Sequence, residues 1–153
     1  MSTTTRSVQH DTIVIERSFD ASPAQVFTAF ADVEFRKRWA VPRGDQLEYE
    51  QSDFSVGGRD LFRCGSPGNL CFHGDVRYED IVPGQRIVYI ENMSDEQVRL
   101  FAGLITAEFF PDNKKTNLRL TLQLASFDGC DMATGCREGY LAVLDNLAQE
   151  LAR

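Results

Sequence analysis

Long apolar runs are missing from this sequence of 153 residues. No run approaches the roughly 20 apolar residues that a membrane-spanning helix requires, and the polar residues 1–10 lack the apolar centre of a secretion signal. Positive charge is also scarce, because 16 basic residues face 23 acidic ones and the formal net charge is −7. This balance disfavours nucleic acid or an anionic membrane surface as a partner. We therefore expect a cytoplasmic protein that binds neither.

The residue patterns that usually carry catalysis or metal binding are absent as well. The four cysteines have no Cys-x-x-Cys spacing, and there is no His-Glu-x-x-His, Gly-x-Ser-x-Gly or glycine-rich phosphate-binding motif. Cys71 and His73 lie two residues apart and would share one face of a strand. These two residues could therefore bind a metal ion, but a purely structural role for the cysteines is the favoured interpretation. We expect reduced cysteines, and we assign no catalytic residue, no metal and no cofactor.

The N-terminal part of the chain has the pattern of one strand followed by two short helices. Residues 12–19 alternate apolar and polar side chains, as a half-buried strand does. Ser22 can cap a helix that starts at Pro23, with Gln25 completing a capping box. A second short helix is expected over residues 33–39, and its basic residues are expected to form a solvated face.

From residue 46 onward the sequence predicts strands separated by turns rich in Gly, Pro, Asp and Asn. The expected strands cover residues 46–55, 58–64, 70–82, 85–93, 98–110 and 116–127. Their short connections imply that neighbouring strands pair antiparallel. Gly74 and Gly103 interrupt otherwise regular strands, and we expect them to mark bulges or bends.

An amphipathic helix is predicted over residues 131–153, because apolar residues recur there every three or four positions. The alternating leucines of residues 118–124 are expected to face it. The predicted fold is α+β: a curved antiparallel sheet of six to seven strands wrapped around a long C-terminal helix, with two short helices after the first strand. We expect residues 1–11 to be a flexible N-terminus and residues 12–153 to be a single domain.

This order of elements carries motifs that resemble the helix-grip, or START-like (SRPBCC), superfamily. Matching pieces are Val56-Gly57-Gly58-Arg59, the run from His73 to Tyr89, Phe127-Asp128-Gly129, and Gly139-Tyr140 in the final helix. Within the superfamily the chain is similar to the activator of heat-shock protein 90 ATPase homologues, a family that includes polyketide-cyclase-like proteins. The resemblance extends over residues 12–153.

The resemblance implies a cavity between the sheet and the final helix that binds a small hydrophobic molecule. Where relatives often carry a Thr-Glu-Gln run in the last strand, this chain has Thr121-Leu122-Gln123, so a more apolar cavity is expected. Aromatic side chains with a few polar groups are the usual lining of such sites. The residues predicted to bind the ligand are Trp39, Tyr49, Phe62, His73, Tyr89, Phe101 and Tyr140.

The leading hypothesis is thus a non-enzymatic protein that binds a hydrophobic or aromatic molecule. One alternative is a polyketide-cyclase-like or other enzyme, with His73 or a buried carboxylate as the group that transfers a proton. Four strand glutamates are candidate carboxylates, although the solvated outer face of the sheet is the favoured location for each: Glu48, Glu50, Glu91 and Glu108. Another alternative is a protein-interaction module, such as a homodimer formed through a sheet edge or an apolar patch.

Overall fold

The computed structural model describes residues 7–96 and 98–153, which form seven strands and three helices. In chain order these elements are β1 (Val8–Phe19), α1 (Pro23–Ala31), α2 (Val33–Trp39), β2 (Gln46–Gln51), β3 (Arg59–Ser66), β4 (Asn69–Val82), β5 (Arg86–Asp95), β6 (Val98–Asp112), β7 (Lys115–Phe127) and α3 (Ala133–Leu151). The predicted fold class is therefore confirmed, including the two short helices and the long final helix. Residues 1–6 of the predicted N-terminal segment lie outside the described residues.

The first strand is longer than predicted. It begins at Val8 and pairs with β7 along its whole length, from Val8 opposite Phe127 to Phe19 opposite Thr116. The side chains of residues 8–11 are mostly exposed, so the apolar alternation that located the strand does not reach them. The strand extends over these residues because their backbone groups pair with β7. Residues 8–11, assigned from the sequence to the N-terminal segment, are thus part of the sheet.

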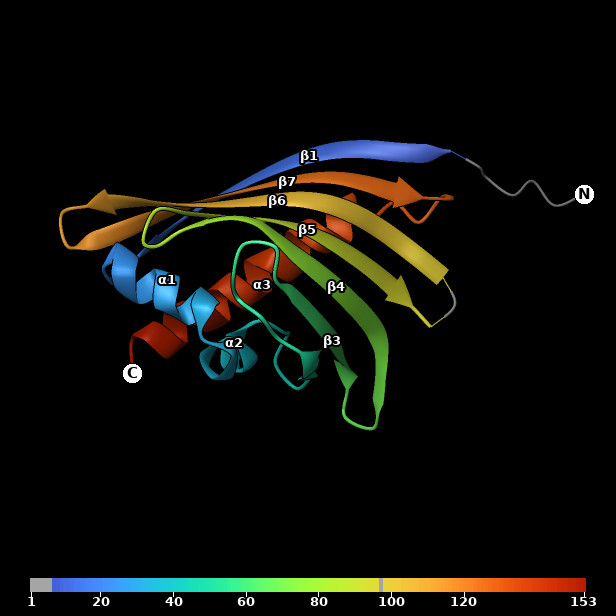
Figure 1. The fold of residues 1–153 in the computed structure, drawn as a ribbon, viewed down its shortest axis with the longest axis horizontal. Coiled ribbons are helices and arrows are strands. Elements are labelled where there is room, and N and C mark those ends of the chain that lie inside the picture. Colours follow the sequence, from blue (N-terminus) through green and yellow to red (C-terminus); the bar gives the residue numbers. More distant parts are fainter. Residues whose placement is uncertain (1–6, 97) are drawn as a thin grey trace, which may run out of the picture.

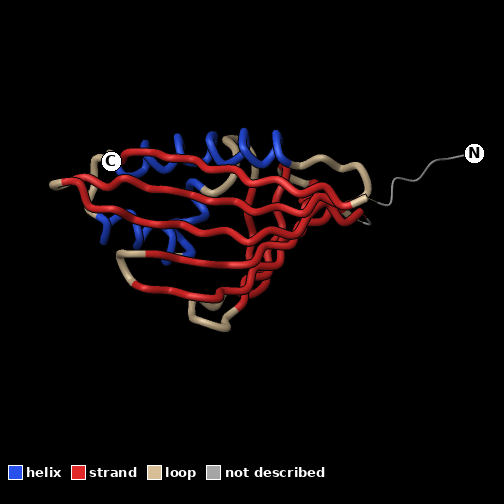
Figure 2. The backbone as a smooth tube through the Cα atoms, turned by 90° about the horizontal axis from the view of Figure 1, so that it is seen from above, coloured by secondary structure: helices blue, strands red, loops and turns tan. Residues whose placement is uncertain are grey.

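All seven strands belong to one antiparallel sheet in the order β1-β7-β6-β5-β4-β3-β2. The N-terminal strand therefore lies beside the C-terminal strand, and β2 forms the opposite edge. The sheet curves over α3, and α1 and α2 lie on the same side of it (Figure 1). Seen from above, the strands run side by side across the molecule (Figure 2). The curvature creates a concave inner face that the helices cover.

Both short helices start where the sequence predicts them, and α2 also ends at the predicted residue. Ser22 caps α1 through the expected capping box: its Oγ accepts from the backbone N–H of Gln25 at 3.2 Å, and its own N–H donates to Gln25 Oε1 at 2.9 Å. Asp32 then caps α2, since its Oδ1 accepts from the N–H of Glu34 at 2.9 Å. These caps satisfy N–H groups that a helix start would otherwise leave unpaired.

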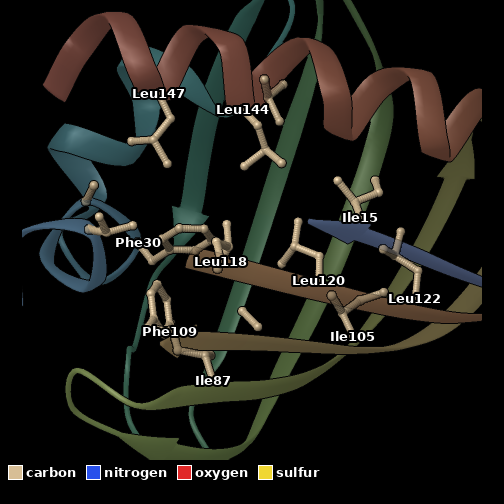
Figure 3. Close-up of a cluster of buried hydrophobic side chains, with 14 of the residues drawn as sticks. Ile15, Phe30, Ile87, Ile105, Phe109, Leu118, Leu120, Leu122, Leu144 and Leu147 are labelled. Carbon is tan, nitrogen blue, oxygen red and sulfur yellow. The ribbon is translucent and has the colours of Figure 1, made fainter. Parts of the chain in front are cut away.

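The core is packed between β7 and the second half of α3. Leu118, Leu120 and Leu122 are at most 1% exposed and point from β7 toward the helix, as predicted. Leu144 and Leu147 descend from α3 onto them (Figure 3). Burial of each such side chain stabilises the fold by about 1.5–3 kcal/mol, so this side of the sheet holds α3 in place.

Gly74 and Gly103 do not mark bulges, one of the two features predicted for them. Both pair regularly with the neighbouring strands, and one of the register shifts on β4 lies instead between Tyr78 and Asp80. A Cβ at Gly74 would lie 2.1 Å from Cζ of Phe62. Glycine is required there because the Phe62 ring lies directly on the strand.

Candidate functional site

A cavity of about 270 Å³ lies between the inner face of the sheet and α3. Strands β2 to β7 form its floor, while α2, the residues after it and the middle of α3 form most of its walls. Aromatic and aliphatic side chains make up most of the lining, and only a few polar groups interrupt it. This composition is typical of sites for small molecules.

The position of the cavity follows from where α3 is held. Its second half packs on the β7 side of the sheet, and the side-chain amide of Asn146 donates to the carbonyl oxygens of Trp39 and Val41, at 3.4 and 3.0 Å. Further toward its start, Gly139 lines the cavity, and a Cβ at that residue would meet no atom within 4 Å. The helix thus leaves space above the central strands because it presents no side chain at this position.

Six of the seven side chains predicted to bind a ligand line this cavity. They are Trp39, Tyr49, Phe62, Tyr89, Phe101 and Tyr140. Trp39 also donates its indole N–H to the carbonyl oxygen of Ala29 at 3.0 Å, which fixes the ring at the α2 end.

His73 does not line the cavity. It lies three residues before Val76 on the regular part of β4, and successive side chains on a strand alternate between faces. Val76 points inward, so His73 lies on the outer face. It lines a second hollow with Asp75 and Arg99, which shares Phe62, Met93 and Phe101 with the cavity. The prediction that His73 faces the ligand is therefore wrong, and His73 cannot serve as a proton-transfer group in the cavity.

A buried ion pair lies at the α2 end of the cavity. Arg36 is 8% exposed and Asp60 is 1% exposed, and Nη1 of Arg36 donates to Oδ2 of Asp60 at 2.7 Å. Tyr78 donates its hydroxyl to the same oxygen at 2.5 Å, and Arg36 Nη1 also donates to the hydroxyl of Tyr49 at 3.1 Å. We call these four residues the Arg36–Asp60 cluster.

Electrostatics keeps Arg36 charged in this cluster. Burial alone would lower its pKa, but the interactions with Tyr49, Tyr78 and Asp60 raise it above the ordinary value, and the carboxylate of Asp60 supplies the negative charge among them at neutral pH. Its Nη2 atom has no hydrogen-bond partner among the described residues. The expectation that the basic residues of α2 form a solvated face is thus wrong for Arg36, which is one helical turn before Trp39 and shares its inward side.

A second polar group faces the cavity from β5 and α3. The Tyr140 hydroxyl donates to Oε1 of Glu91 at 3.2 Å, and the hydroxyls of Tyr89 and Tyr140 are hydrogen-bonded at 3.1 Å. Burial raises the pKa of Glu91 from 4.5 to about 7, although the hydrogen bond from Tyr140 opposes this rise. Near neutral pH, Glu91 is therefore divided between its protonated and ionised forms.

The cysteines and tyrosines around Glu91 remain neutral near pH 7. Burial is the main cause of the raised pKa of Cys64, about 11, and of Cys136, about 12, and the charge of Glu91 adds to it. Burial likewise raises the pKa values of Tyr89 and Tyr140 above their ordinary value. Among these neighbours, Glu91 alone changes charge in the neutral range.

Sequence reasoning misplaced two groups, Glu91 and His73, that a strand-parity argument could have placed correctly. Glu91 shares its strand face with Ile87, Tyr89 and Met93, an apolar set that faces inward. The same test places His73 with Asp75 and Arg77, a polar set that faces outward. The sequence around Asp60 does not indicate that this residue is buried, because its burial depends on pairing with Arg36 of α2.

Comparison with known proteins identifies the family. The family model described as "Activator of Hsp90 ATPase homolog 1-like protein" matches residues 20–152. The chain belongs to this family. The predicted resemblance is thereby confirmed, over almost the same range of residues. No curated protein matches the sequence.

Solved structures of bacterial proteins share the fold of this family member. A crystal structure from Rhizobium loti is 42% identical, with a TM-score of 0.86, and the match covers 94% of this chain and 99% of that one. An uncharacterized protein from Rhizobium leguminosarum is 33% identical, with a TM-score of 0.88 and coverages of 96% and 97%. A protein from Chromobacterium violaceum, 24% identical with a TM-score of 0.80 and coverages of 90% and 94%, shares the fold alone.

Two general features complete the description. Among residues 7–96 and 98–153, no helix is both long enough and apolar enough to cross a membrane. The four cysteines are free thiols, and Cys64 and Cys136 line the cavity.

Proposed function

We propose that this protein binds a small hydrophobic or aromatic molecule in the cavity between the sheet and α3. The cavity itself carries this proposal: it has a volume of about 270 Å³, and its lining is mostly aromatic and aliphatic. A cytoplasmic location is part of the proposal, because free thiols suit a reducing compartment. The superfamily resemblance, which implies hydrophobic ligands, supports it further.

The volume sets the size of the molecule. A dry cavity of about 150 Å³ in another protein accepts benzene, so about 270 Å³ suits a molecule of roughly two fused rings. Binding would also satisfy Nη2 of Arg36 if the molecule presented an acceptor oxygen. An unpaired buried donor costs about 1–3 kcal/mol, and a ligand that removes this cost gains affinity.

A cavity-filling variant tests the proposal. Gly139→Leu places a side chain into the open space above Gly139, whereas Gly135→Leu, one turn earlier on α3, places it at an exposed position. Native mass spectrometry and thermal shift with naphthalene derivatives should show retention by the natural protein and by the Gly135 variant, but not by the Gly139 variant. Equal retention by both variants, or no retention by the natural protein, would reject the cavity as the binding site.

The location of Glu91 favours one second candidate, an enzyme that moves a proton on a bound cyclic molecule. A carboxyl group with a pKa of about 7 can both take and give a proton at neutral pH. A retained ligand with an acidic C–H bond should then exchange that hydrogen in deuterated water, and Glu91→Gln should stop the exchange without preventing binding. If the variant exchanges as fast as the natural protein, Glu91 has no such role.

A further inference from the structure

We propose that the cavity selects ligands that carry a protonated amine, with Glu91 as the anchor of the amine and the aromatic lining around its apolar body. This inference rests on the proposed binding function and specifies the chemical class of the ligand. It begins with the balance of charge inside the cavity.

The cavity lining holds two acidic side chains and one basic side chain. The basic one, Arg36, is paired with Asp60 at 2.7 Å. Asp60 also accepts from the hydroxyl of Tyr78 at 2.5 Å and from the backbone N–H of Asp53 at 3.1 Å. Both oxygens of Asp60 are thus occupied, and the pair leaves no free charge for a ligand.

Glu91 has no such compensation. Among the described residues it takes part in no salt bridge, and its one hydrogen bond from a side chain is that of Tyr140 to Oε1, at 3.2 Å. A buried carboxylate without a cation is costly, and nature usually pairs such a group. A ligand ammonium would supply the missing charge and the missing donors for Oε2.

The rings around Glu91 suit a cation as well. The faces of aromatic rings attract positive charge, and aromatic cages are a general means of binding ammonium groups. Arg36 already uses this attraction within the cavity, with its guanidinium carbon 5.3 Å from the centre of the Tyr49 ring. The rings of Phe62, Tyr89 and Tyr140 line the remaining space. A carboxylate ligand, by contrast, would meet the uncompensated charge of Glu91. The donor that Arg36 leaves open to it, Nη2, belongs to a guanidinium whose charge Asp60 already balances.

The groups that face Glu91 allow its titration to be observed separately. They are Tyr89 on its own strand, Tyr49 on β2, Cys64 on β3, Cys136 and Tyr140 on α3, and the Arg36–Asp60 pair at the α2 end. The pKa values of these tyrosines and thiols are raised, mainly by burial, so they stay neutral while Glu91 titrates. Binding of an amine should therefore follow the ionisation of Glu91.

Three probes on one ring system test the inference: 2-naphthylmethylamine, 2-naphthalenemethanol and 2-naphthoate. Their dissociation constants for the full chain are measured by calorimetry from about pH 5.5 to about pH 8.5, on both sides of the pKa of Glu91. At the upper pH the amine should bind at least about tenfold more tightly than the alcohol, and the naphthoate most weakly. Amine affinity should fall as the pH drops through about 7, while alcohol affinity stays constant.

Two variants assign the effect to Glu91. Glu91→Gln keeps an acceptor oxygen for Tyr140, so it should lose the preference for the amine while still binding the alcohol. Tyr140→Phe removes a hydrogen bond that lowers the pKa of Glu91, so the pH midpoint of amine binding should move upward. A protein that binds the alcohol as tightly as the amine, or a Glu91→Gln variant that keeps the preference, overturns the inference alone. Failure of all three probes to bind overturns the proposed function with it.

Discussion

Replacing Glu91 with glutamine should stabilise the protein above neutral pH and leave its stability unchanged in acid. The pKa of this carboxyl is 4.5 when exposed and about 7 in the folded protein, and each pKa unit corresponds to about 1.4 kcal/mol. Ionised Glu91 therefore costs the folded state about 3 kcal/mol, which glutamine does not. The size of the effect follows from burial of the carboxyl and from the single hydrogen bond of Tyr140.

The sign of the pH dependence follows from proton binding. Between pH 4.5 and about 7, the folded protein keeps the proton of Glu91 and the unfolded chain has lost it. Stability due to this group is therefore fully present below 4.5, decreases as the pH rises, and is lost above about 7. Glu91→Gln removes this decrease, so the two proteins should differ most at pH 8.

Urea unfolding of both proteins from pH 4 to pH 8 measures the effect. At pH 8 the variant should be more stable by about 3 kcal/mol, or higher in Tm by roughly 6–12 °C for a chain of this size. Glu50→Gln, at an exposed position on β2, is the matched control and should show no such difference. If the Glu91→Gln and natural proteins differ by the same amount at every pH, then Glu91 ionises without cost and the reasoning is refuted.

Three further substitutions have expected outcomes. Asp60→Asn should destabilise the protein by about 3–5 kcal/mol in urea unfolding, because the charge of buried Arg36 loses its partner. Gly74→Ala should cost about 1–3 kcal/mol and weaken ligand binding, because the new methyl group displaces the Phe62 ring toward the cavity. Ser22→Ala should lower the free energy of unfolding by about 1 kcal/mol, since α1 loses its capping box.

Two further substitutions serve as controls, one for Asp60→Asn and one for Gly74→Ala. Asp75→Asn breaks an ion pair with Arg59 that is open to solvent, and should cost less than about 1 kcal/mol. An equal loss for Asp60 and Asp75 would contradict the importance of burial. Phe62→Leu should relieve part of the cost of Gly74→Ala, and strictly additive effects would show that the ring and the methyl group do not collide.

The fold could be predicted from the sequence because local signals agree with one another. The box at Ser22 and Gln25 starts α1, and the alternating leucines from Leu118 define a strand with one buried face. Each signal depends on neighbours in sequence. The start of β1 could not be located in this way, because pairing with β7, far away in the chain, extends it to Val8.

The site was only partly predictable for the same reason. Aromatic residues such as Tyr89 and Tyr140 could be placed near the gap between sheet and helix. The sequence did not establish which face of each strand points inward, and this orientation puts Glu91 in the cavity and His73 outside it. Arg36 was assigned to solvent because its partner, Asp60, is 24 residues away and on another element. The free volume itself depends on how closely α3 approaches the strands, which no local pattern determines.

The unequal anchoring of the two ends of α3 bears on the route by which the proposed ligand would enter. Near its C-terminal end, Asn146 holds the helix to the segment after α2, and the Arg36–Asp60 ion pair holds α2 to β3. Opening there would expose paired charges. The other end begins at Ala133 without a side-chain cap. It is tied to β7 by a hydrogen bond from the N–H of Met132 to Oγ of Ser126, at 3.0 Å, and without an ion pair among the described residues its first turn should open at a lower free energy than the C-terminal half. A ligand would then enter and leave the cavity beneath the first turn of α3. Amide hydrogen exchange should accordingly be faster in that turn than in the rest of the helix.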